Sequence, residues 1–300
     1  MSVRNNTGES RESVREPERQ KRIAAIHDIS CVGRCSLTVA LPILSAAGID
    51  TGVLPTAVLS THTGGFTGFT YRDLTSDIQP ISDHWKSLDL KFDALYSGFL
   101  GSFDQIDLVA DLFQRFKTQD NLVMVDPVMA DEGKLYSIYS PEMARGMAKL
   151  CAKADIILPN LTEAAFILEE DYVEGPYTRE YIEGMLYRLS RLGPKKVVLT
   201  GVWFDKNQLG AAALDSETGV ISYAFSKRIE GHFHGTGDVF GSALLAGLMN
   251  GFSLEKSIEI GVNYTYSCIE KTVELNQERR YGVCFEKALP GFIKALGLTD

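Results

Sequence analysis

The sequence predicts an α/β protein of three layers (α/β/α), in which helices cover both faces of a mostly parallel central sheet. Short apolar runs rich in Val, Ile and Leu alternate along the chain with longer segments of helical periodicity. The runs are almost continuously apolar, which is typical of strands buried on both faces. Each run is bounded by Gly, Pro or Asp. This alternation predicts strand–helix–strand units with right-handed crossovers.

The chain from Arg22 onward follows this alternation. The predicted strands are Ile23–His27, Gly52–Leu59, Ala94–Gly98, Leu122–Asp126, Asp155–Leu158 and Lys196–Thr200. The predicted helices between them are Leu37–Ala47, Gln105–Phe116, Pro141–Lys153, Glu163–Glu169 and Arg179–Leu192. Because each helix returns the chain to the edge where the preceding strand began, neighbouring strands are expected to run parallel.

The pattern changes after the last of these strands. Two further apolar runs, Leu209–Leu214 and Val220–Phe225, are separated by a turn and predict a small antiparallel hairpin near residues 209–225. Three helices are expected after it, at Gly237–Met249, Leu254–Val273 and Phe285–Leu296. Gly251 stands where a glycine commonly ends a helix.

Residues 1–21 differ from the rest of the chain in composition. They contain no aromatic residue and very few apolar ones, so they cannot bury enough surface to offset the entropy lost on ordering. We expect a disordered tail over residues 1–21. Since no second linker or internal repeat follows, residues 22–300 are expected to form one α/β domain.

The charge balance excludes several classes of function. The chain has 30 basic and 39 acidic residues and a formal charge of −9, so it has no overall attraction for nucleic acid or anionic membranes. No apolar run reaches the roughly 18 residues of a membrane span, and no signal peptide opens the chain. A cytoplasmic protein is expected, and its five cysteines are expected to be thiols.

Polar residues follow several of the predicted strands. They are His27-Asp28, Thr56, Asp126-Pro127, Pro159-Asn160 and Thr200-Gly201. Ligands of open α/β sheets bind beyond the carboxyl ends of the strands. The topology therefore predicts that these residues from distant parts of the chain gather along one edge and form a binding site.

The most informative segment is His-Gly-Thr-Gly-Asp-Val-Phe-Gly, residues 234–241, which opens a strongly apolar helix. Without Cβ atoms, Gly235 and Gly237 allow a tight turn that aims main-chain N–H groups into one hollow, and the helix adds its positive end. This predicts a phosphate site. Asp238 beside it is a candidate base for a hydroxyl that attacks phosphorus; the alternative is a first-turn acid that complements the helix dipole.

Other phosphate motifs are absent or poorly matched. The chain has no G-x-x-x-x-G-K-[ST] segment, which disfavours a P-loop. The glycine spacing over residues 235–241 is one residue longer than the dinucleotide fingerprint and comes late in the chain, which disfavours a dinucleotide-dependent oxidoreductase. Asn160-Leu-Thr-Glu163 has two readings, a helix capping box or a segment that organises hydrated Mg²⁺.

Four segments together resemble the pyridoxal kinase branch of the ribokinase-like superfamily. They are Gly-Thr-Gly-Asp (235–238), Leu-Ser-Thr-His-Thr-Gly (59–64), Asp-Pro-Val-Met-Ala-Asp (126–131, with Ala130 in place of a glycine) and Asn-Leu-Thr-Glu (160–163). They occur in the family's order, and the resemblance spans the chain from Ile23 to the last helix. It implies a ribokinase-like fold.

The resemblance also implies an activity. This is ATP-dependent phosphorylation of the 5′-hydroxymethyl group of a B6 vitamer: pyridoxal, pyridoxine or pyridoxamine. Asp238 is implied as the base, and the amides of Gly235, Thr236 and Gly237 as an anion hole for the transferred phosphoryl group. The implied partners are these small molecules, with no nucleic acid and no membrane, and the implied assembly is a homodimer.

The other site residues come from the same resemblance. The implied substrate contacts are Asp28, Thr56, His62 and Phe99, although His62 is equally consistent with a loop-bonding histidine. The implied ATP contacts are Asp131, Asn160, Glu163 and Thr200. The resemblance implies Mg²⁺ near Glu163 and Asp126, and a monovalent cation such as K⁺.

Two positions depart from the family pattern and keep alternatives open. Asp28 stands where many pyridoxal kinases have a serine, and Phe99 stands where some have a tyrosine. An acidic residue at position 28 also resembles the pattern of the related hydroxymethylpyrimidine kinases. At the position of Asp238, however, those kinases usually carry Cys. The alternatives are therefore a hydroxymethylpyrimidine kinase of the same fold and a catalytically idle protein that binds pyridoxal phosphate or nucleotide.

Overall fold

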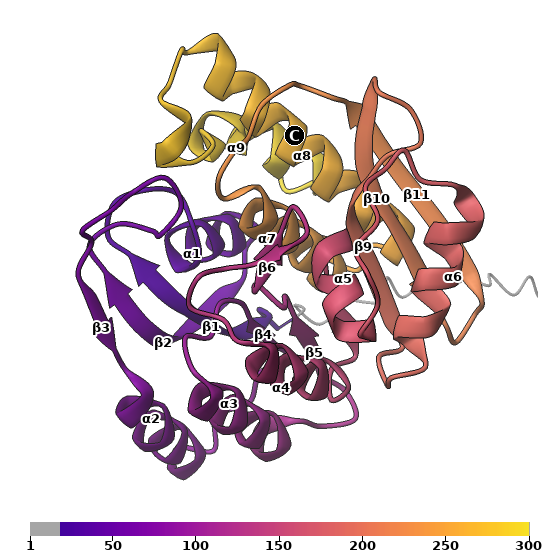
Figure 1. The fold of residues 1–300 in the computed structure, drawn as a ribbon. Coiled ribbons are helices and arrows are strands. Elements are labelled where there is room, and N and C mark those ends of the chain that lie inside the picture. The colour runs from indigo at the N-terminus through magenta and orange to yellow at the C-terminus, as the bar shows by residue number, and fades with distance from the viewer. Residues whose placement is uncertain (1–18, 300) are drawn as a thin grey trace, which may run out of the picture.

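The computed structural model describes residues 19–299, and its central feature is a nine-stranded sheet with the order β11-β10-β9-β8-β5-β4-β1-β2-β3 (Figure 1). The parallel strands are β1 (Arg22–Ser30), β2 (Asp50–Leu59), β4 (Ala94–Ser97), β5 (Leu122–Val125), β8 (Ile156–Ile157) and β9 (Lys196–Val202). The antiparallel strands are β3 (Tyr71–Asp73) at one edge of the sheet, and β10 (Gln208–Asp215) followed by the edge strand β11 (Val220–Lys227) at the other. The predicted fold class and hairpin are confirmed.

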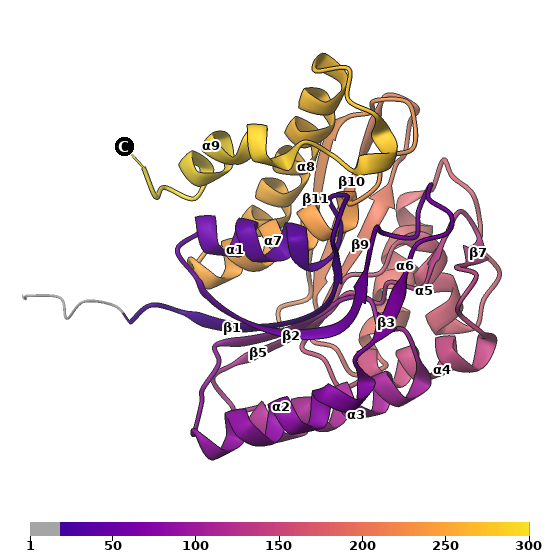
Figure 2. The same ribbon diagram turned by 90° about the vertical axis from the view of Figure 1, so that its left-hand side faces the viewer.

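Helices cover both faces of this sheet (Figure 2). One face packs against α2 (Thr75–Ser87), α3 (Phe103–Phe116), α4 (Pro141–Cys151), α5 (Leu161–Leu168) and α6 (Arg179–Ser190). The other packs against α1 (Leu37–Ala46), α7 (Thr236–Met249), α8 (Leu254–Glu274) and α9 (Phe285–Ala295). Alternate side chains of β1 supply the two cores, Ala24 and Ile26 on one face and Ile23 on the other.

Some elements were not predicted from the sequence. Helix α2 has Pro80 in its interior and buries only Ile78 and Ser82, so it lacks a clear apolar stripe. Strand β3 has three residues, all exposed, and therefore no alternating pattern. A two-stranded sheet of β6 (Ala130–Asp131) and β7 (Lys134–Leu135) and a short 3₁₀ helix at Arg279–Tyr281 complete the described elements.

The expected tail over residues 1–21 lies almost wholly outside the described residues. Where the description begins, Arg19 forms an ion pair with Asp93 at 2.7 Å, and the carbonyl of Lys21 accepts a hydrogen bond from Asp50. The division of the chain at residue 22 stays a prediction. None of the helices within residues 19–299 has the length and apolar character needed to cross a membrane. All five cysteines are free thiols, as expected.

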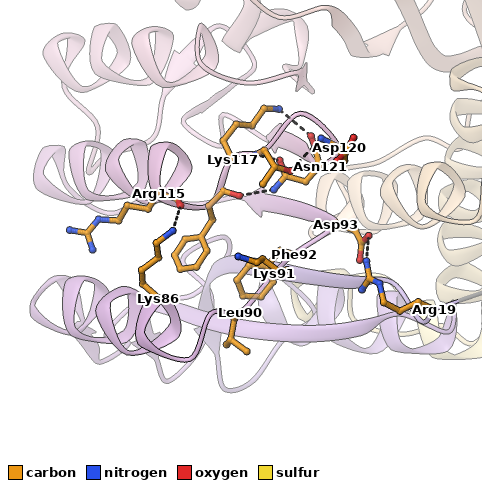
Figure 3. A pocket seen from close by; sticks show the side chains of 12 residues that line it. Arg19, Lys86, Leu90, Lys91, Phe92, Asp93, Arg115, Lys117, Asp120 and Asn121 are labelled. Atoms are coloured by element: carbon orange, nitrogen blue, oxygen red, sulfur yellow. Dashed lines mark hydrogen bonds and ion pairs between the residues drawn. The ribbon is translucent and has the colours of Figure 1, made fainter.

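A cavity of about 340 Å³ opens at the amino-terminal edge of the sheet, where Asp93 precedes β4 and Asn121 precedes β5 (Figure 3). Several cations line it, but most are already paired: Arg19 with Asp93, Lys91 with Asp89, Arg115 with Asp83 and Lys117 with Asp155. Ligands of such sheets bind at the opposite edge. The carboxyl ends of the strands are therefore the expected place for the functional site.

Candidate active site

The carboxyl ends of the parallel strands collect the polar residues singled out in the sequence. Asp28 lies near the end of β1 and Thr56 near the end of β2, while Asp126 follows β5. Asn160 follows β8 and pairs with Thr200 of β9 through an isolated parallel bridge. Since these strands are neighbours in the order β9-β8-β5-β4-β1-β2, the residues share one edge.

The glycine loop before α7 has the tight geometry that its sequence suggests. Gly235 caps the helix with φ 76°, and a Cβ atom there would lie 2.0 Å from the carbonyl oxygen of Arg34. Only glycine satisfies both conditions. Thr236 and Gly237 follow in the first turn of α7, where N–H groups have no helical acceptor. The loop therefore presents main-chain donors and the positive end of a helix to an anion.

Asp238 lies in this first turn and is only partly exposed. The protein around it removes water from the carboxylate and raises its pKa to about 7, and the nearby charge of Asp28 acts in the same direction. A hydrogen bond from the main-chain N–H of Ser36 opposes the shift. A carboxylate with a pKa near neutrality, beside an anion site, has the properties of a general base.

Asp28 is the second acid of this region and is almost completely buried, at 3% exposure. Burial raises its pKa, while hydrogen bonds from Ser36 and from the Ser30 hydroxyl (3.2 Å) stabilise its charged form. The thiol of Cys35 lies near both acids, and burial together with their charge raises the pKa of Cys35, so it stays protonated. Asp28 and Asp238 thus lie close enough for the charge of Asp28 to act on Asp238, with the Cys35 thiol near both.

Thr56 and Phe99 meet across β2 and the loop after β4. The Thr56 hydroxyl donates to the Phe99 carbonyl at 3.3 Å, and both residues lie in the predicted substrate region. Gln105 was not singled out from the sequence, yet it is fully buried and holds this corner together. Its side chain donates to the Thr56 carbonyl (2.9 Å) and accepts from the Gly101 N–H (2.8 Å).

His62 is engaged in loop bonds. Its Nδ1 accepts a hydrogen bond from the Gly64 N–H at 3.2 Å, and its Nε2 lies 2.6 Å from the carbonyl oxygen of Arg280. Burial lowers the pKa of His62, which favours the neutral ring with a proton on Nε2. The hypothesis that His62 forms hydrogen bonds within the loops thus has a structural basis. A contact between its ring and a substrate stays a prediction.

Other histidines gather beside His62. The His234 ring lies 5.1 Å from the His62 ring and 4.7 Å from the His232 ring, between centroids. Across residues 19–299, no three His, Cys, Asp or Glu side chains are arranged to hold a metal ion by themselves. The Nδ1 atom of His232 lies 3.9 Å from a carboxylate oxygen of Glu132, which follows Asp131 in the turn between β6 and β7. This turn therefore approaches the segment that leads into the glycine loop.

Asn160 and Glu163 form a complete capping box at the start of α5. The Asn160 side chain accepts from the Glu163 N–H and Glu163 accepts from the Asn160 N–H, both at 2.9 Å. The other Glu163 oxygen accepts from the Met129 N–H at 3.1 Å, and the Asn160 side chain donates to the Ala130 carbonyl at 2.8 Å. The capping reading is confirmed, and the box also fixes the segment after β5.

The buried carboxylates near this box influence each other. Burial raises the pKa of Glu163 to about 8. Burial, then the charge of Glu163, raises the pKa of Asp126 well above its ordinary value. Asp131, on β6, is half-buried, and burial raises its pKa as well. Carboxylates that oppose each other's ionisation favour a nearby cation, and hard oxygen donors suit Mg²⁺.

Replacing Glu163 with alanine is expected to lower the free energy of unfolding by about 2–4 kcal/mol, because it leaves the N–H groups of Met129 and Asn160 without acceptors in a buried region. Denaturant unfolding measures this change. Glu142→Ala is the matched control, an exposed first-turn glutamate of α4, and is expected to change stability by less than about 0.5 kcal/mol. Equal losses in the two variants would contradict the capping role.

Comparisons with known proteins show the family to which this chain is related. The model of the phosphomethylpyrimidine kinase family matches residues 48–282. The pyridoxal kinase PdxY of Actinobacillus pleuropneumoniae is 30% identical over 75% of this chain and 80% of its own length. The pyridoxal kinase of Arabidopsis thaliana is 26% identical over 86% of this chain and 84% of its own length.

Two solved structures are similar over most of their length. One, from Bacteroides thetaiotaomicron, is assigned as a phosphomethylpyrimidine kinase and holds pyridoxal; it is 38% identical, has a TM-score of 0.87 and covers 91% of this chain and 96% of its own. The pyridoxal kinase of Lactobacillus plantarum is 31% identical, with a TM-score of 0.83 and coverage of 92% and 97%. The chain therefore belongs to the family of phosphomethylpyrimidine and pyridoxal kinases and is a phosphotransferase with the ribokinase-like fold.

Proposed function

We propose that this kinase transfers the γ-phosphoryl group of ATP to the 5′-hydroxymethyl group of a B6 vitamer. The observation that carries the proposal is the position of Asp238, a carboxylate with a pKa of about 7. It lies in the first turn of α7, and this helix begins directly after Gly235, which has a left-handed backbone. The Bacteroides thetaiotaomicron relative that holds pyridoxal supports the choice of substrate. A homodimer in the cytoplasm is part of the same proposal.

In this proposal Asp238 accepts the proton of the vitamer's hydroxyl as the oxygen attacks the γ-phosphorus. The new O–P bond forms, the bond between phosphorus and the bridging oxygen breaks, and ADP leaves. The N–H groups of residues 235–237 and the positive end of α7 stabilise the negative charge that builds up on the transferred group. Asp238 then returns its proton to solvent, which it reaches because it is partly exposed.

The carboxylates of Asp126 and Glu163 fit a magnesium ion held partly through water. Both are buried; the charge of Glu163 acts on Asp126 and that of Asp131 acts on Glu163, and an Mg²⁺ ion would relieve this repulsion. When bound, Mg²⁺ neutralises charge on the ATP phosphates. Asn160, Asp131 and Thr200 are proposed to face the nucleotide. A requirement for K⁺ belongs to the same proposal and is tested by replacing K⁺ with Na⁺ in the assay.

The substrate ring is proposed to lie among Asp28, Thr56 and Phe99. The Phe99 ring is half-buried and offers a flat apolar surface, while the Asp28 carboxylate offers an acceptor to a ring N–H or an amine. Such an acceptor favours a protonated pyridine or an amino-substituted ring. His62 is proposed to border this pocket through the loop that it ties to Arg280.

A second candidate function is phosphorylation of hydroxymethylpyrimidine. It is favoured by the match of residues 48–282 to the phosphomethylpyrimidine kinase family and by Asp28, which can accept a hydrogen bond from an aminopyrimidine. Asp238 favours the B6 reading, because the pyrimidine kinases that this sequence resembles usually carry a cysteine there.

The experiment that decides is ADP release with ATP and Mg²⁺ across pyridoxal, pyridoxine, pyridoxamine and hydroxymethylpyrimidine. We expect kcat/KM for at least one B6 vitamer to exceed that for hydroxymethylpyrimidine by tenfold or more, about 1.4 kcal/mol. Turnover of hydroxymethylpyrimidine alone would overturn the proposal that a B6 vitamer is the substrate. If the protein binds ATP and pyridoxal phosphate but turns over none of the four, it is an idle binding protein.

The rate is expected to depend on pH through Asp238. Only the deprotonated carboxylate accepts a proton, and its pKa is about 7, so kcat/KM rises from pH 5.5 to pH 8 with a midpoint near pH 7. Steady-state rates over this range measure the midpoint. A flat profile, or one with a midpoint near the ordinary aspartate value, would show that Asp238 is not the group that limits the rate.

A further inference from the structure

The side chain of Gln105 joins two segments that lie on opposite sides of β1. Strands β2 and β4 flank β1 in the sheet order, so each pairs with β1 rather than with the other. Thr56 lies on β2, and Gly101 lies in the loop after β4. The Gln105 amide donates to the Thr56 carbonyl at 2.9 Å and accepts from the Gly101 N–H at 2.8 Å. One side chain thus links the strands on either side of β1.

Further contacts fix the orientation of this amide. Its nitrogen lies 3.0 Å from the Thr75 hydroxyl at the start of α2 and 3.2 Å from a carboxylate oxygen of Asp73 on β3. Acceptors therefore surround the nitrogen, while a main-chain donor meets the oxygen. Gln105 is fully buried, at 0% exposure. A buried amide whose donors and acceptor are all engaged is held in one orientation.

Helix capping does not account for all of these contacts. In a capping box, the third residue of a helix accepts from the N–H of the N-cap residue. Gln105 is the third residue of α3 after the N-cap Ser102, but it accepts from Gly101, one residue earlier. Capping needs only an acceptor, which a glutamate would also supply. The glutamine adds a donor nitrogen, and this nitrogen reaches β2, β3 and α2.

The pairing of β1 with β2 is irregular where Gln105 holds β2. The register shifts by one residue between His27 and Ile29, so Thr56 and Ala57 of β2 lie opposite the single residue Asp28. Such a bulge disrupts the ladder of main-chain hydrogen bonds locally. The ladder between β1 and β2 therefore constrains the main chain of Thr56 weakly, and the hydrogen bond from Gln105 adds a constraint at this point.

We propose that Gln105 is a positioning residue that sets the distance between Thr56 and Phe99, the two sides of the pocket for the substrate ring. The assignment of this pocket rests on the proposed function. Phe99 lies two residues before Gly101, and its carbonyl accepts from the Thr56 hydroxyl at 3.3 Å. Gln105 adds a second link between the same two segments, and two links also resist rotation of one segment against the other. Gln105 acts through these main chains.

Gln105→Met tests this role, because methionine keeps the length of the side chain and removes both links. We expect KM for the preferred substrate to rise about 5–20-fold, since the two sides of the pocket are no longer held together. KM for ATP is expected to stay within about twofold, because the residues proposed to face the nucleotide lie on β6, after β8 and on β9. Steady-state ADP release measures both constants. A substrate KM equal to that of the parent overturns the role.

Asn121→Leu is the matched control for the loss of a buried amide. Asn121 is 8% exposed, donates to the Phe116 carbonyl at 2.7 Å and accepts from the Thr118 N–H at 2.8 Å, at the amino-terminal edge of the sheet. Both variants are expected to lower Tm by about 4–8 °C. Only Gln105→Met is expected to raise the substrate KM by more than about twofold. An equal rise in both would attribute the effect to lower stability and contradict the positioning role.

Gln105→Asn provides the test if Gln105→Met does not fold. Asparagine keeps the amide but is shorter by one methylene, so it cannot reach the Thr56 carbonyl and the Gly101 N–H together. We expect the substrate KM to rise about threefold or more. A Gln105→Asn variant with the KM of the parent would show that the two links do not set the pocket.

Calorimetric binding of pyridoxal and hydroxymethylpyrimidine separates this inference from the proposed function. If the parent phosphorylates no B6 vitamer but binds one of the two compounds about fivefold more tightly than Gln105→Met does, the proposed function fails and the positioning role stands. An active parent with no difference in binding or KM from Gln105→Met has the opposite meaning. A parent that binds neither compound overturns both.

Discussion

Asp238→Asn is expected to lower kcat by about 10²–10⁴-fold, the range that a positioned general base contributes. Asparagine keeps the size of the side chain and cannot accept the proton of the acceptor hydroxyl. The glycine loop and the end of α7 remain, so KM for ATP is expected to change by less than about threefold. Steady-state ADP release with the preferred vitamer measures both constants.

The stability of this variant provides the control. Burial raises the pKa of Asp238 in the folded protein to about 7, well above the ordinary aspartate value of 3.8. The folded state therefore holds the proton more tightly than the unfolded state, and the stability linked to it is lost as pH rises from about 4 to about 7. Asparagine does not ionise, so at pH 8 the variant is expected to melt no lower than the parent. A large fall in Tm would attribute the lost activity to misfolding.

Gly235→Ala is expected to be the most damaging substitution in the loop. A methyl group at Gly235 would lie 2.0 Å from the Arg34 carbonyl oxygen, and φ is 76°. To relieve the clash, the loop must move, and its N–H groups then lose their aim at the phosphoryl group. We expect kcat to fall by about 10²-fold or more and the free energy of unfolding to fall by about 1–3 kcal/mol.

Gly251→Ala is the control that measures the effect of backbone strain without the steric clash expected in Gly235→Ala. Gly251 follows α7 at its other end with φ 84°, and a Cβ atom there would meet nothing within 4 Å. Alanine at this position is expected to lower stability by about 1 kcal/mol without changing kcat. Chemical denaturation and steady-state rates compare the two variants. If Gly235→Ala behaves like Gly251→Ala in both measurements, the close approach of Arg34 does not shape the anion site.

Much of the fold was predictable because parallel strands buried on both faces leave a strong signal in the sequence. Strands β1, β2 and β5 and helices α1, α3 and α7 lie within a few residues of the predicted ranges. Their ends are marked by local chemistry, such as the serine cap of α3 at Ser102. Helix α2 was missed because tertiary packing, rather than a periodic apolar face, holds a helix that contains Pro80.

The candidate site was predictable where its chemistry is local. Asn160 and Glu163 are three residues apart, so the capping box was visible in the sequence. The role of Gln105 depends on Thr56 and Gly101, which lie on other segments, and a polar residue near a helix start gives no sign of burial. The positive φ of Ser36 likewise depends on contacts between distant segments, and a serine at that position does not predict it.

The most direct test of the account compares ADP release with pyridoxal and with 5-deoxypyridoxal, which has a methyl group in place of the acceptor hydroxymethyl, in the parent and in Asp238→Asn. The account expects rapid release only from the parent with pyridoxal, because Asp238 acts on the hydroxyl that the analogue lacks. Equal rates with the two compounds, or equal rates from parent and variant, would show that Asp238 does not activate an alcohol on the vitamer.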